Sequence, residues 1–313
     1  MKTRTLSRWA VATTLLLVTF GGFTRGSGSG YGCADRWPLC HNGLLGGILP
    51  RAEFHMIVEW THRWLAAIVG ALAVATAVVV WRRAERWIAW VAISAVLVVG
   101  VQAWVGRLVV VRKLDADLVS LHLVISMTVL ALLTLVVVAT TPVADTARHR
   151  AWAYRFGVGA ALAFAVLVLG SQVHNLYIPG WPLVSNELFP SLSNRFVALH
   201  FFHRVLAGGG FAYLVWIAIR AHRQQRPKLE QRVLWVGVGA YAVNIGLGAA
   251  HVFTKVMWSG IVSAHLGAAS VVWVALVGVT AFAAGLGAPP TTRGVSHGSS
   301  TGEQPDAAPR LGS

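Results

Sequence analysis

Eight apolar runs, separated by short charged segments, limit the possible folds of this chain more than any other feature. They cover approximately residues 9–23, 57–80, 87–106, 118–140, 152–171, 196–219, 233–253 and 261–284. Most have the roughly 20 residues that a helix needs to cross a bilayer. Only 12% of the residues are charged, against about a quarter in soluble domains. We therefore expect an all-α membrane protein with eight transmembrane helices.

The basic residues predict how these helices are oriented. Under alternating topology, sixteen lysines and arginines of the segments between and beyond the runs fall on the side of the N-terminus and eight on the other. Basic residues concentrate on the cytoplasmic side, so both termini are expected in the cytoplasm, in the plasma membrane of a bacterium. The first run follows a basic start and could be a signal peptide, but no small-residue cleavage pattern follows it. We retain it as a span.

The two halves of the chain repeat at an offset of about 140 residues. Segment 61–66 (THRWLA) matches 202–207 (FHRVLA), 119–123 (VSLHL) matches 262–266 (VSAHL), and WPL occurs at 37–39 and 181–183. We interpret this as two tandem four-helix bundles related by internal duplication with parallel topology. The expected divisions are a cytoplasmic N-terminus (1–8), an N-terminal half (9–140), a cytoplasmic linker (141–151), a C-terminal half (152–284) and a disordered cytoplasmic tail (285–313).

Four histidines fall near the outer ends of even-numbered spans. They are His62, His122, His203 and His265, separated by 60 residues in the first half and 62 in the second. At a rise of 1.5 Å per residue, all four imidazoles lie at similar depth. Two parallel helices of one half can therefore offer two axial nitrogens to the flat macrocycle of a haem.

The histidines and the positive charge each have a simpler interpretation. A single histidine in a membrane often only bonds a neighbouring helix, but four at matched depth favour ligation. Metals other than haem iron would want further ligands, and the first half offers only Glu59. His200 could replace His203 as a ligand, although the alignment favours His203. The net charge of +15 does not indicate nucleic-acid binding, because the basic residues lie in topology-setting loops.

Several motifs together resemble the haem A synthase family. They are GGFTR at 21–25 followed by GSG at 28–30, Cys33 through WPLC at 37–40, EWTHR at 59–63, His122, His203-Arg204 and His265. The resemblance extends from about residue 10 to 285 and excludes the tail. It implies an oxidoreductase that converts the methyl group of haem O to a formyl group through an alcohol, giving haem A.

An acid distinguishes the two halves. Glu59 lies three residues before His62 on the same helix face, whereas the matching position of the second half is His200. A carboxyl group within a span is costly and usually functional. We expect the first half to bind the reacting haem O through His62 and His122, with Glu59 as acid, base or cation stabiliser. The second half would hold a resident haem b through His203 and His265, and the resemblance implies the same assignment. Alternatively, Glu59 only pairs with Arg63.

Two arginines and two cysteines complete the predicted site. Arg63 and Arg204 each follow a ligand histidine and would meet haem propionates or snorkel to the interface. Cys33 and Cys40 flank a Trp-Pro turn in the first outside loop, and their spacing allows a bridge there. The resemblance implies a disulfide with a possible redox role. A second cysteine pair that some relatives carry in the third outside loop is absent, which puts in doubt any mechanism requiring both.

The predicted partners follow from the resemblance. Haem O synthase, a farnesyltransferase, would supply the substrate, and cytochrome oxidase or its assembly factors would receive the product, with lipid and an electron partner. A di-haem electron-transfer cytochrome is the alternative function, and it would yield haem b alone on extraction. A transporter is a further alternative and would be colourless when purified.

Overall fold

A computed structural model describes residues 2–173 and 177–289 of the chain. It contains eight long α-helices: α1 (Lys2–Gly26), α2 (Phe54–Arg83), α3 (Arg86–Val111), α4 (Ala116–Ala139), α5 (Arg150–Val173), α6 (Arg195–Arg223), α7 (Lys228–Phe253) and α8 (Ser259–Ala283), with a short 3₁₀ turn η1 (Leu45–Gly47). All eight α-helices are long and apolar enough to cross a membrane. The predicted all-α, eight-span membrane fold is confirmed.

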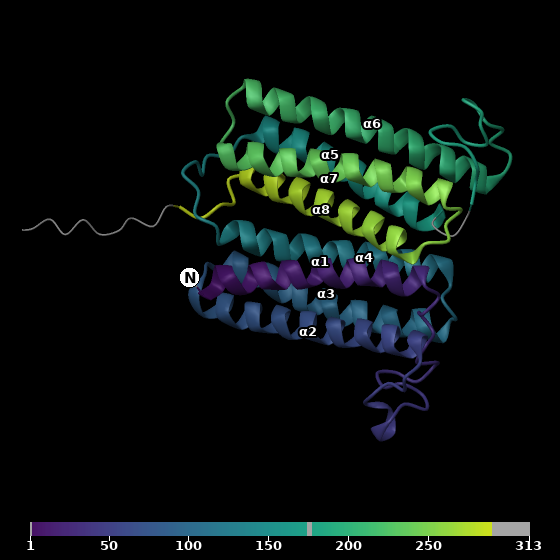
Figure 1. Ribbon diagram of the computed structural model, residues 1–313. Helices are drawn as coiled ribbons and strands as arrows, with labels where there is room; N and C mark the ends of the chain where they lie inside the picture. The colour runs from purple at the N-terminus through teal and green to yellow at the C-terminus, as the bar shows by residue number, and fades with distance from the viewer. Residues whose placement is uncertain (1, 174–176, 290–313) are drawn as a thin grey trace, which may run out of the picture.

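The helices form two groups that lie side by side along a common axis (Figure 1). In the first group α1, α2, α3 and α4 each pack on the next, and α4 closes the ring against α1. Helices α5 to α8 repeat this order of neighbours, with α8 closing against α5. The same neighbour order supports the predicted duplication, which itself stays a prediction.

The interface between the groups is made by α8 packing on α1 and α4 and by α4 packing on α5. Polar side chains bridge it: Trp273 Nε1 donates to the Met127 carbonyl oxygen over 2.9 Å, and Ser263 Oγ donates to the Thr19 carbonyl oxygen over 2.7 Å. Such hydrogen bonds help to hold helices together inside a membrane, where burying apolar side chains stabilises helix association only slightly. Helix α1 thus packs on helices of its own group and on α8 of the other, as expected of a retained span.

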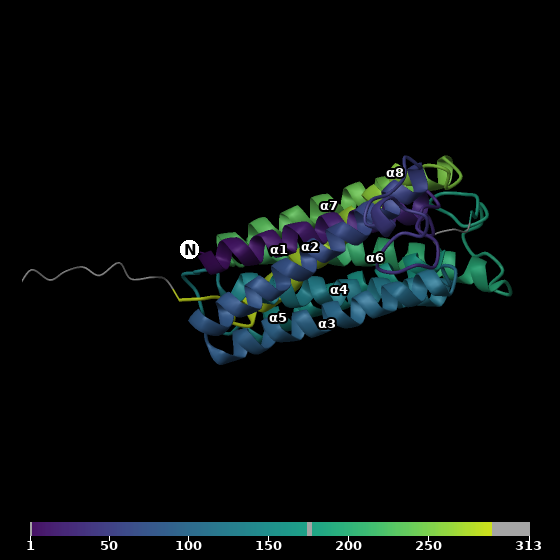
Figure 2. The same ribbon diagram turned by 90° about the horizontal axis from the view of Figure 1, so that it is seen from below.

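Both described ends of the chain lie at one end of the bundle, and the loops 27–53 and 177–194 lie at the other (Figures 1 and 2). We call the end of the bundle that carries these two loops the loop end. Large apolar side chains such as Leu97, Trp104 and Val243 are exposed on the helices, a surface suited to lipid.

Two expected segments differ in detail from the structure. Helix α1 begins at Lys2, so the predicted N-terminal segment 1–8 is helical from that residue onward. At the start of the predicted tail, the Ala288 amide donates to the Thr141 carbonyl oxygen over 3.0 Å, which docks residues near 288 on the 141–151 linker. Residues 290–313 of that tail lie outside the described residues.

Candidate functional site

The four predicted histidines lie near the loop end of the bundle. His62 and His203 are eight residues from the starts of α2 and α6, and His122 and His265 are six residues from the starts of α4 and α8. Helix α2 stands diagonally opposite α4 in the first ring of helices, and α6 stands diagonally opposite α8 in the second. Each pair therefore faces the inside of its own four-helix ring.

A connected cavity of about 1180 Å³ runs through both rings of helices and is lined by all four histidines. Most of its other lining residues are apolar or glycine. His200 and Glu59 also line it, so each group has a further titratable side chain three residues before its α2 or α6 histidine. An apolar cavity with a few converging polar groups is the usual form of a cofactor site.

Each histidine ring lies against a glycine of the preceding helix. A Cβ atom built on that glycine would approach the ring to between 3.0 and 3.3 Å, which leaves little space for any larger residue. The pairs are Gly21 with His62, Gly106 with His122, Gly170 with His203 and Gly248 with His265. Glycine thus lets the flat rings lie directly on a neighbouring backbone. These contacts were not predicted, although a glycine in each odd-numbered span was a visible signal.

The hydrogen bonds of the imidazoles differ between the groups. In the second group, the Nδ1 atoms of His203 and His265 donate to the carbonyl oxygens of Val166 and Asn244 over 3.1 and 3.0 Å. Such a bond fixes the tautomer and leaves Nε2 free to bind a metal. In the first group, the Nδ1 atom of His122 is buried and has no hydrogen-bond partner within the described residues.

A different bond holds His122 in the first group. Gln102, which occupies the place of Asn244 in the repeat, donates from Nε2 to the carbonyl oxygen of His122 over 2.9 Å. This bond anchors the backbone of α4 and does not involve the imidazole. The His265 ring, by contrast, is tied at Nδ1 and stacks parallel to His251 at a centroid separation of 6.5 Å.

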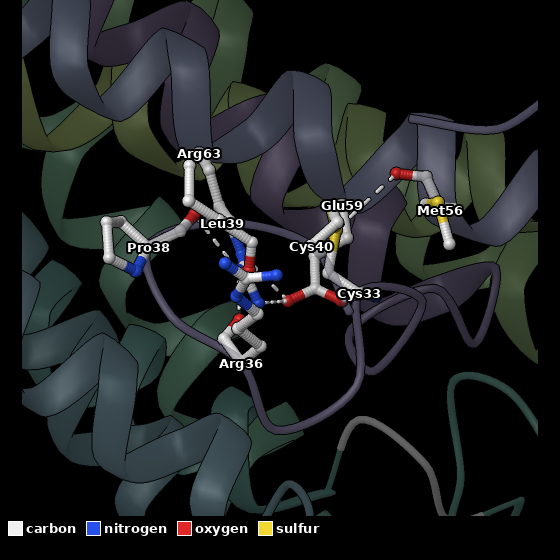
Figure 3. A network of polar contacts seen from close by, with 8 residues as sticks. All are labelled: Cys33, Arg36, Pro38, Leu39, Cys40, Met56, Glu59 and Arg63. Carbon is white, nitrogen blue, oxygen red and sulfur yellow. Dashed lines mark hydrogen bonds and ion pairs between the residues drawn. A yellow bond between two sulfur atoms is a disulfide. The ribbon is translucent and has the colours of Figure 1, made fainter. Parts of the chain in front are cut away.

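Glu59 is only 3% exposed and is held from two sides. One carboxylate oxygen, Oε2, accepts a hydrogen bond from the Cys33 peptide N–H over 2.7 Å. The other, Oε1, accepts from Arg63 Nε over 3.1 Å and from Arg63 Nη2 (Figure 3). The ion pair between Glu59 and Arg63, which the sequence offered as an alternative role for Glu59, is therefore present. No sequence pattern indicated the contact from the loop.

Arg63 and Arg204, which directly follow His62 and His203, hold the two loops at the loop end. Arg63 Nη1 donates to the carbonyl oxygens of Arg36, Pro38 and Leu39, over 2.8, 3.2 and 3.0 Å (Figure 3). Arg204 makes the corresponding contacts with the carbonyl oxygens of Ile178, Gly180 and Leu183. Each set of carbonyls surrounds one of the repeated Trp-Pro-Leu segments, so both arginines close a loop over the cavity.

Cys33 and Cys40 form a disulfide whose two half-cystines are buried. The bridge packs against Met56 and Trp60 at the start of α2. The predicted disulfide is therefore present in the structure, in the loop that contacts Glu59.

Thiol labelling should find both cysteines protected until a reductant is added. The bridge is buried against α2, so we expect reduction to require strong conditions and to loosen the 27–53 loop more than the bundle. Labelling with and without reductant, followed by mass spectrometry, measures this. Two labelled thiols in protein purified without reductant would contradict the bridge.

Comparison with known proteins gives a consistent result. A profile of the cytochrome oxidase assembly protein family (COX15-CtaA) matches residues 4–277. A protein of Symbiobacterium thermophilum named heme A synthase is 28% identical over 85% of this chain and 93% of its own length. Proteins of the same name from Alkalihalophilus pseudofirmus and Bacillus licheniformis are 27% and 28% identical, over 77% and 71% of this chain and 84% and 76% of their own lengths.

Proposed function

This chain belongs to the cytochrome oxidase assembly protein family, and we propose that it is the oxidoreductase that makes haem A from haem O. It oxidises a methyl group of the substrate to a formyl group through an alcohol. One observation carries the residue-level proposal: two equivalent histidine pairs line one cavity, and among the described residues a buried carboxylate is held beside only the first pair.

The residues of the second group fit a resident haem b. His203 and His265 lie across an apolar cavity, and their Nδ1 atoms are tied to backbone carbonyls. Imidazoles fixed in this way keep Nε2 directed at one place, which suits a cofactor that stays bound. The haem would supply one-electron transfer, while the chain holds its iron and excludes water.

The residues of the first group fit a haem that must enter and leave. His62 and His122 would bind the iron of haem O, and the Nδ1 atom of His122, unlike those of His203 and His265, is not tied to a backbone carbonyl within the described residues. Glu59 would exchange a proton with the reacting substituent as it is oxidised, or stabilise positive charge developing there. The substrate's farnesyl tail would lie in the lipid-facing part of this group.

Arg63 and Arg204 are proposed to meet haem propionates, because each follows a ligand histidine at the loop end and arginine suits carboxylates. Both guanidinium groups now donate to loop carbonyls. Propionate binding would therefore share or replace some of these bonds, and would couple haem binding to the position of the two loops.

The distribution of basic residues supports a loop end that faces away from the cytoplasm in a bacterial plasma membrane. Haem O synthase would deliver the substrate through the bilayer, and cytochrome oxidase or its assembly factors would receive haem A. Where water supplies the formyl oxygen, a methyl group and one water give the formyl group, four protons and four electrons, so an electron acceptor completes the reaction.

Extraction and chromatography of the haems from purified protein test the proposal. We expect haem b together with haem O, the alcohol or haem A, because one group holds a cofactor and the other a substrate. Protein containing haem b alone, even when co-produced with haem O synthase, would support the electron-transfer cytochrome instead. Colourless protein would favour a transporter.

A further inference from the structure

Among the described residues, the first group differs from the second in having both an acid beside its histidine pair and a disulfide in its loop, and the structure connects the two. The Cys33 residue that forms the bridge also donates its peptide N–H to Glu59 Oε2 over 2.7 Å (Figure 3). We propose that the bridged 27–53 loop is a positioning element for Glu59, with Gly32, Cys33 and Cys40 as positioning residues. This inference rests on the proposed role of Glu59 and adds a function for the disulfide.

The contact is specific because the loop backbone lies directly on α2. A Cβ atom on Gly32 would come within 2.1 Å of the His55 carbonyl oxygen and 2.7 Å of the Met56 nitrogen. Only glycine permits this approach, one turn of helix before Glu59. The Cys33 amide is thereby brought to the buried carboxylate, where a hydrogen bond to a charged acceptor is strong.

The bridge holds the rest of the loop in the same place. The His41 amide donates to the Cys33 carbonyl oxygen over 3.0 Å, and the Cys40 amide donates to the Gly47 carbonyl oxygen over 3.0 Å. The two half-cystines pack on Met56 and Trp60. These contacts fix the loop on the first turns of α2, so the Cys33 N–H cannot drift from Oε2.

The second group shows that loop closure alone does not need a disulfide. Arg204 holds the 177–194 loop through three carbonyl oxygens, as Arg63 holds the first loop. That loop contains no cysteine, and His200 stands where Glu59 would be. The disulfide thus occurs in the loop that contacts a carboxylate. This indicates that it positions Glu59 and is not needed merely to keep a loop closed.

Gly32→Ala tests positioning without changing the sulfur chemistry. Displacing the loop should lower kcat for haem A formation by about 10- to 100-fold, because small misplacements of reacting groups have effects of this size. KM for haem O should stay within about twofold, since the histidine ligands are untouched. The double variant Cys33→Ser with Cys40→Ser should likewise lower kcat and leave KM nearly unchanged. Asp35→Ala, which removes a neighbouring exposed side chain of the same loop, is the matched control and should retain normal kcat.

A spectroscopic measurement separates failure of this inference from failure of the proposed function. The chain has only two cysteines, so ¹⁵N-cysteine labelling gives two amide resonances, and Cys40→Ser assigns them. Gly32→Ala and Glu59→Ala should each move the Cys33 resonance, whether or not the protein makes haem A. A retained b-type spectrum would show that each variant is folded.

Three results would overturn the inference. Normal kcat in Gly32→Ala despite a moved Cys33 resonance would show that the contact does not position Glu59. A loss confined to the double cysteine variant would assign the bridge a redox role. A Cys33 resonance insensitive to Glu59→Ala would mean that the hydrogen bond is absent. Wild-type protein that makes no haem A would instead refute the proposed function.

Discussion

Replacement of Glu59 by glutamine is expected to lower haem A formation by about 10²- to 10⁴-fold, the contribution typical of a positioned acid or base. Glutamine keeps the size of the side chain and one oxygen that accepts from the Cys33 N–H, but it loses the ionisable proton. His62 and His122 are unchanged, so haem binding should persist. Haem O or its alcohol should accumulate in the purified protein, as chromatography of the extracted haems would show.

A second buried ion pair supplies the matched control. Glu230 is 4% exposed and accepts from Arg226 Nε and Nη2 over 2.9 and 2.8 Å, with the same spacing of four residues as Glu59 and Arg63 but in the reverse order. It lies at the opposite end of the bundle, near the start of α7. Glu230→Gln should therefore affect stability without reducing haem A formation per folded molecule.

Glu59→Asp should recover little activity. The shorter arm withdraws the carboxylate from the Cys33 N–H and from the cavity, although its charge is retained. If both Glu59→Gln and Glu59→Asp produced normal haem A and differed only in stability, the pair with Arg63 would be structural. That result would favour the electron-transfer cytochrome.

Substitution of His203 or His265 by alanine should abolish six-coordinate haem b binding while the helical fold persists. Each change removes one axial nitrogen and leaves space beside the glycine against which the ring lies. Absorption spectra of the purified variants and circular dichroism measure the two properties. A full six-coordinate b-type spectrum in both variants would contradict the assignment.

His222→Ala controls for loss of a histidine from the same helix as His203. His222 lies near the far end of α6, where Nδ1 is 3.0 Å from Gln231 Oε1. Its removal should leave the haem spectrum unchanged. Because His200 also lines the cavity, His200→Ala distinguishes the two adjacent histidines: loss of haem there with retention in His203→Ala would exchange their roles.

The sequence determined the features that depend on position along a single helix. A bilayer of given thickness demands long apolar runs, so eight spans were predictable. The fixed rise per residue put His62, His122, His203 and His265 at one depth. The i,i+4 spacing of Glu59 and Arg63 made their pairing a stated alternative, and the structure contains it.

Only the tertiary structure decided which groups meet from different helices and loops. The Cys33 N–H on Glu59, the glycine beneath each imidazole, the loop carbonyls on Arg63 and the Nδ1 bonds of His203 and His265 all depend on how helices rotate and approach one another. A helix that is apolar around its whole circumference does not specify its rotation through a hydrophobic stripe. Close packing between helices and loops therefore set these contacts, and with them the difference between the two histidine pairs.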